Sequence, residues 1–62
     1  MTKPRCKLTG EDGNIFNLLG IARRTLKRAG LSAQAQEMTE RVTQSGSYHE
    51  ALAVIMDYVE VE

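Results

Sequence analysis

The chain has 62 residues, enough for one small domain with a modest hydrophobic core, and 42% of them are hydrophobic, as in ordinary globular proteins. No apolar run approaches the ~20 residues that a transmembrane helix requires, and a single cysteine cannot form an intrachain disulfide. We therefore exclude a membrane-spanning or disulfide-stabilised class and expect a single cytoplasmic domain over residues 1–62.

The charges are unevenly distributed, although the net charge is zero. Residues 1–31 carry seven basic and two acidic side chains, whereas residues 32–62 carry one basic and six acidic side chains. The two halves therefore differ in sign, with a charge of +5 on the first and −5 on the second. This pattern predicts a dipolar molecule whose basic part is available for a negatively charged partner.

Residues 1–5 read as a flexible basic arm, and residues 10–14 read as a turn that leads into a helix. The stretch from Gly13 to Leu31 then predicts one amphipathic helix, around which the rest of the chain packs. Asp12 or Asn14 can cap its start, and Gly30 suits the left-handed position of a Schellman-type closure at its end. Its inner stripe has helical spacing and consists of Ile15, Leu18, Leu19, Ala22, Leu26 and Ala29.

Two further helices follow. Ser32 is the expected N-cap of a second helix that runs to about Thr43, with Gly46 as the left-handed residue after its end. The second helix buries a narrow stripe of Ala35, Met38 and Val42. Residues 47–50, Ser-Tyr-His-Glu, form a capping box in which Ser47 caps the third helix and Glu50 reaches back to the Ser47 amide.

The fold class predicted from these elements is mainly α, a small three-helix bundle with short connections. The end of the chain alternates apolar and acidic residues with the period of a strand. A short two-stranded β pairing between residues 5–8 and residues 59–61 is therefore left open as an addition to the bundle.

Catalytic and metal sites find little support in the sequence. Cys6 and His49 are the only thiol and imidazole, no motif links them, and together they fall short of the four ligands usual for zinc. A calcium loop counted from Asp12 would place Arg23 where the terminal glutamate belongs. We therefore predict a non-enzymatic protein with no catalytic residue, cofactor, metal or small-molecule substrate.

The basic residues of the first helix are the better candidates for a site. They lie four residues apart in two pairs on its outer face and can contact several phosphates: Arg23, Arg24, Lys27 and Arg28. The alternative is that they pair with the acidic half, within one molecule or across a dimer. A helix-turn-helix arrangement of the last two helices is rejected, because its recognition helix would carry Glu50 and Asp57 and no Arg or Lys.

Self-association is the second candidate. The first and third helices each have an apolar arc wider than one neighbouring helix can cover. The residues left for a partner, and thus for a homodimer contact, would be Phe16, Ile21, Val54 and Met56. Alternatively, the N-terminal arm and the strand pair cover this surface.

Three motifs carry a resemblance: the run from Lys7 to Phe16, Leu-Gly-Ile-Ala-Arg-Arg at residues 19–24, and Met-Asp-Tyr-Val-Glu-Val-Glu at residues 56–62. In these the chain resembles small uncharacterised proteins of bacterial phages and mobile elements, over residues 6–62. The resemblance implies a bacterial cytoplasmic setting and favours an accessory role around nucleic acid. We predict a self-associating protein–protein interaction module, with a nucleic-acid-binding accessory protein that uses the basic face as the alternative.

Overall fold

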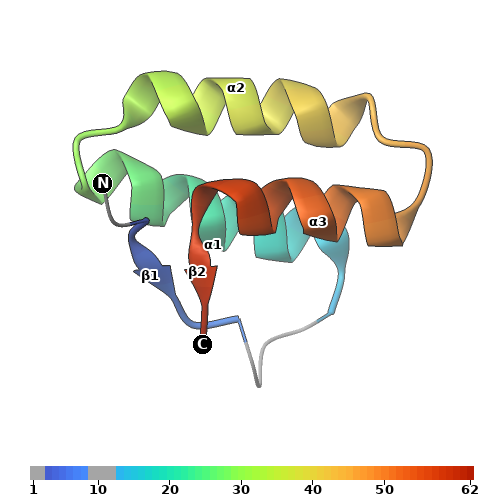
Figure 1. Ribbon diagram of the computed structural model, residues 1–62, viewed down its shortest axis with the longest axis horizontal. Coiled ribbons are helices and arrows are strands. Elements are labelled where there is room, and N and C mark those ends of the chain that lie inside the picture. Colours follow the sequence, from blue (N-terminus) through green and yellow to red (C-terminus); the bar gives the residue numbers. More distant parts are fainter. Residues whose placement is uncertain (1–2, 9–12) are drawn as a thin grey trace.

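The computed structural model describes residues 3–8 and 13–62, and in these ranges three helices pack together above a pair of short strands (Figure 1). The elements in chain order are β1 (Arg5–Cys6), α1 (Ile15–Arg28), α2 (Ser32–Thr43), α3 (Tyr48–Tyr58) and β2 (Glu60–Val61). The predicted mainly α three-helix bundle is confirmed, and so is the strand pair between the ends of the chain.

Helix α1 begins at the predicted cap. The Asn14 side chain accepts a hydrogen bond from the Phe16 backbone N–H at 2.8 Å, and Asn14 itself is extended, with φ −62° and ψ 129°. This bond satisfies one of the amides that a helix start leaves unpaired. Asp12, the other predicted cap, and the rest of the acidic turn at residues 11–12 lie outside the described residues.

The end of α1 is the predicted Schellman closure. Gly30 has φ 78°, the Leu31 N–H donates to the Leu26 carbonyl at 2.8 Å, and the Gly30 N–H donates to the Lys27 carbonyl at 3.0 Å. The helix therefore stops at Arg28, and Ala29, predicted on the inner stripe, is exposed beyond its last turn.

The start of α2 differs from the prediction. Ser32 is the first helical residue, and Leu31 occupies the N-cap position with no side-chain hydrogen bond. The reason is the short connection: the Schellman closure uses residues 29–31, so the chain is already helical at Ser32.

The connection from α2 to α3 confirms one prediction and corrects two. The Ser47 hydroxyl accepts from the Glu50 N–H at 3.2 Å, as a capping serine should. The Glu50 carboxylate, however, accepts from the Gly46 amide at 2.9 Å, one residue earlier than predicted. Gly46 does not adopt the predicted left-handed conformation: among the described residues, Gly30 alone has a positive φ. Helix α2 ends at Thr43, and its C-cap residue, Gln44, has a right-handed conformation.

One hydrophobic core lies between the helices and the strand pair. Helix α1 buries four of the six residues predicted for its inner stripe, Leu18, Leu19, Ala22 and Leu26, and α2 buries the predicted Ala35, Met38 and Val42. The largest side chains removed from water are Leu26, Met38, Ile55 and Val59. Leu26 comes from α1, Met38 from α2 and Ile55 from α3, so all three helices share this core.

The strands pair in parallel, with Arg5 opposite Glu60 and Cys6 opposite Val61 (Figure 1). The Pro4 carbonyl accepts from the Glu60 N–H at 2.9 Å. Lys3 also donates to the Met56 carbonyl, at 2.9 Å. Residues 3–5, predicted as part of a flexible arm, are thus anchored to the end of the chain, because the Lys3 ammonium bonds a carbonyl of α3 and β2 supplies partners for the backbone that follows. Residues 1–2 lie outside the described ranges.

Candidate functional site

The outer side of α1 carries a dense group of positive charges, which we call the α1 basic face: Arg23, Arg24, Lys27 and Arg28. All of these side chains are exposed, as the sequence predicts. The spacing from Arg23 to Arg28 corresponds to about 8 Å of helix length. The bundle therefore presents this group of cations toward water on one helix.

This arrangement is costly for an isolated helix. Arg23 and Lys27 are four residues apart, as are Arg24 and Arg28, and like charges at this spacing destabilise a helix by about 0.2–0.5 kcal/mol per pair. Lys27 and Arg28 recover part of this cost, because cations in the last turn interact favourably with the negative end of the helix. An anion bound across the face would relieve the remaining repulsion.

The cations of the α1 basic face find no partner in the described part of the chain. None of them makes an ion pair or a side-chain hydrogen bond with residues 3–8 or 13–62. The only acid–base pair among these residues is Arg41–Asp57, with 3.2 Å between the guanidinium nitrogen and the carboxylate oxygen. Helix α1 itself contains no acidic residue. Pairing between the α1 basic face and the acidic half is therefore absent from the described ranges.

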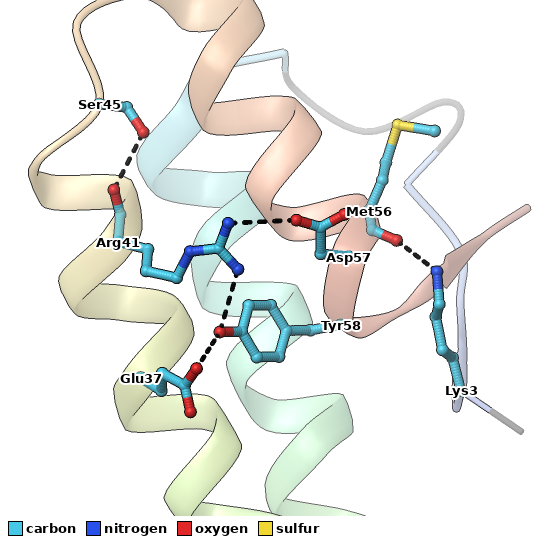
Figure 2. A network of polar contacts seen from close by, with 7 residues as sticks. All are labelled: Lys3, Glu37, Arg41, Ser45, Met56, Asp57 and Tyr58. Atoms are coloured by element: carbon cyan, nitrogen blue, oxygen red, sulfur yellow. Dashed lines mark hydrogen bonds and ion pairs between the residues drawn. The ribbon is translucent and has the colours of Figure 1, made fainter. Parts of the chain in front are cut away.

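Figure 2 shows the polar contacts that residues of the acidic half make with one another. Tyr58 donates from its hydroxyl to the Glu37 carboxylate at 2.8 Å and accepts from Arg41 at 3.2 Å, and the Arg41 guanidinium lies 5.5 Å from the Tyr58 ring centre. The hydrogen bond to Tyr58 is the largest cause that raises the pKa of Arg41 above its ordinary value. This network joins α2 to α3, so the one cation of the second half has a structural role.

A groove runs along the seam between the basic face and α2. It encloses about 300 Å³ and is lined by Arg23 and Lys27 on the α1 side. The α2 side supplies three uncharged polar side chains, Ser32, Gln36 and Thr39, and the carboxylate of Glu40. Glu40 makes no ion pair with either cation in the described chain. The groove can hold an anionic group between two cations and side chains able to donate hydrogen bonds, although Glu40 would oppose it.

The four residues predicted for self-association do not share one surface. Phe16 and Met56 are 77% and 50% exposed, whereas Ile21 and Val54 are partly buried against the core. Val54 and Met56 are two positions apart on α3, so their side chains point about 160° apart, and Phe16 and Ile21 differ by about 140° on α1. A single flat partner cannot cover all four residues.

Phe16 instead borders an apolar groove where α1 and α3 begin. The groove encloses about 380 Å³, and we call it the Phe16 groove. Its apolar lining consists of Ile15, Phe16, Leu19, Val42, Tyr48 and Ala51, and the remaining lining residues fall within 43–47 and are uncharged. Tyr48, which is 47% exposed here, was not among the residues predicted for a partner surface.

Cys6 and His49 are not brought together. Cys6 is buried on β1, beside the Thr25 hydroxyl at 3.4 Å, whereas His49 is exposed in the first turn of α3. Strand β1 pairs with β2, which follows the far end of α3, so the length of α3 separates the two side chains. Within residues 3–8 and 13–62, no three Cys, His, Asp or Glu side chains gather closely enough to hold a metal ion.

Comparisons of the chain with known protein families, with curated proteins and with solved structures give no match. In the ranges that the structure describes, no helix has both the length and the apolar content needed to cross a bilayer. The site must therefore be interpreted from its own geometry.

Proposed function

We propose that this chain is a small accessory protein that binds nucleic acid without sequence preference, through the phosphates that contact the α1 basic face. One observation carries the proposal: four exposed cations gather on one helix and have no partner in the described chain. Cations that served only to neutralise the acidic half would pair with it. Phosphate groups offer the negative charge that the protein itself does not supply there.

The segregation of charge supports the same conclusion. The acidic side chains of the described residues lie on α2, α3 and the last three residues, and none lies on α1. A polyanion that approaches α1 therefore meets four cations, although the whole chain is neutral and Glu40 of α2 lies beside Arg23 and Lys27. The resemblance to small proteins of phages and mobile elements agrees with a role around nucleic acid, and a bacterial cytoplasmic setting remains part of this proposal.

The test is a fluorescence anisotropy titration with labelled duplex and single-stranded DNA and RNA at several salt concentrations. If four phosphates are contacted, the logarithm of the affinity should fall against the logarithm of salt with a slope of about −3.6 for duplex and about −2.8 for single strands. Between 50 and 200 mM salt this corresponds to a loss of about 150-fold and about 50-fold, respectively.

A charge-matched pair of variants localises the contact. Arg24→Gln, which removes one cation from the basic face, should lower the magnitude of the slope by about 1. Arg41→Gln removes the same charge from the network of Figure 2 and should leave the slope unchanged. The absence of salt-sensitive binding, or an equal effect of the two variants, would refute the proposal.

A further inference from the structure

The Phe16 groove combines a projecting side chain and a hollow on one small area. Phe16 is 77% exposed at the groove, which encloses about 380 Å³. Leu19 and Ala51 are buried at its apolar lining. A surface that carries both a projection and a complementary hollow can pair with a second copy of itself across a two-fold axis, because each copy then supplies both parts.

The walls of the groove are fixed by hydrogen bonds. The Tyr48 hydroxyl donates to the Gly13 carbonyl at 2.7 Å and so ties the start of α3 to the residues before α1. The Ser47 cap holds the first turn of α3 at the same end of the bundle. A preformed hollow reduces the entropy lost on binding, so an aromatic side chain can occupy it without rearrangement of the fold.

The charges around the groove favour a second copy as the occupant. Among residues 3–8 and 13–62, no charged residue lines the groove, so a contact there buries none of the charges of the described chain. Glu50 lies beyond the α2–α3 connection, where its carboxylate accepts from Gly46, and Arg23 lies two turns along α1 from Phe16. In a dimer whose two-fold axis passes between Arg23 and Glu50, Arg23 of one copy lies on the side of Glu50 of the other copy.

We propose that the Phe16 groove is the contact of a homodimer, in which Phe16 of each copy enters the groove of the other. A buried aromatic anchor in an apolar pocket is the usual energetic centre of such contacts. This inference can be tested separately from nucleic-acid binding, because Arg24, Lys27 and Arg28 remain outside the groove lining. Arg23, the fourth cation of the α1 basic face, lies beside the proposed contact.

The test is the molar mass of the chain without nucleic acid, measured by light scattering or sedimentation up to millimolar concentration. The mass should rise from one chain to two. Phe16→Ser removes the anchor from an exposed site in the first turn of α1, where serine is compatible with the helix. This change should weaken the dimer at least about 30-fold, the loss expected for an anchor residue.

Two further variants locate the contact. Thr43→Arg places a cation at an exposed position of the groove lining and in the last turn of α2, where a cation is favourable, so it should weaken the dimer comparably while the monomer stays folded. Met56→Ser alters a large exposed side chain outside the groove and should change nothing. Far-UV circular dichroism verifies that each variant is helical.

Several outcomes would overturn the inference. A mass of one chain at all concentrations would exclude the dimer, and growth beyond two chains would exclude a two-fold contact. Dimerisation of Thr43→Arg at the parent affinity would show that Phe16 contacts a different surface. An equal loss in Met56→Ser would mean that the association is not specific to the groove.

Discussion

The substitution Leu26→Ala tests whether α1 organises the core. Leu26 is 0% exposed, and its carbonyl also accepts the Leu31 N–H that closes the end of α1. Leu→Ala changes at buried sites cost about 2–5 kcal/mol, the spread reflecting how far the cavity collapses. For a chain of 62 residues, a typical stability of about 0.05–0.15 kcal/mol per residue corresponds to about 3–9 kcal/mol in total.

The loss is therefore a large share of the folding free energy. Urea and thermal unfolding, followed by far-UV circular dichroism at a concentration where the chain is monomeric, measure it directly. The melting temperature should fall by at least about 8 °C, given about 4–8 °C per kcal/mol for a domain of this size. Met56→Ala, at a half-exposed site, is the control and should stay within about 0.5 kcal/mol of the parent. An equal effect of the two substitutions would show that the core is not centred on α1.

Two smaller predictions use the same unfolding measurement. Ser47→Ala removes the hydroxyl that accepts the Glu50 N–H and should lower the free energy of unfolding by about 1 kcal/mol. The control Ser45→Ala removes a hydroxyl that caps no helix start and should lower it by less. Equal losses in the two variants would contradict the capping role of Ser47. Tyr58→Phe removes a hydroxyl that bonds Glu37 and Arg41 between α2 and α3 and should cost about 1 kcal/mol. Asp57→Asn should lower the free energy of unfolding by less than Tyr58→Phe does, because the Asp57 side chain is 60% exposed and exposed ion pairs contribute little. A larger loss for Asp57→Asn would mean that the ion pair, and not the Tyr58 hydroxyl, holds α2 against α3.

The fold could be predicted from local signals because they agree with one another. The apolar period of α1, its cap at Asn14 and the glycine at its end all indicate the same helix. Ser47 likewise predicts the start of α3 correctly. The misassigned positions, Ser32 and Gly46, lie in short connections, where the closure of one helix and the start of the next compete for the same few residues. Sequence preference alone does not decide that competition.

The candidate site was less accessible to sequence reasoning. The sequence predicts exposed cations on α1, but whether they pair with the acidic half depends on how the helices are rotated in the bundle. The hydrogen bonds of Tyr58 with Glu37 and Arg41 span 21 and 17 positions in the chain, and no local pattern indicates them. The prediction of one surface that includes Phe16, Val54 and Met56 fails for a different reason, because the helical period alone directs Val54 and Met56 to different sides of α3.

Helix α1 divides its surface among three tasks along its length and around its circumference. The inner stripe ending at Leu26 stabilises the bundle, Phe16 in the first turn borders the apolar groove, and the cations from Arg23 onward face water. A dimer formed through Phe16 would place two α1 basic faces on one particle. Where both faces can reach the same nucleic acid, the second contact becomes intramolecular and raises the overall affinity. A neutral chain of this size could in this way retain a polyanion that a single group of four cations would release at physiological salt.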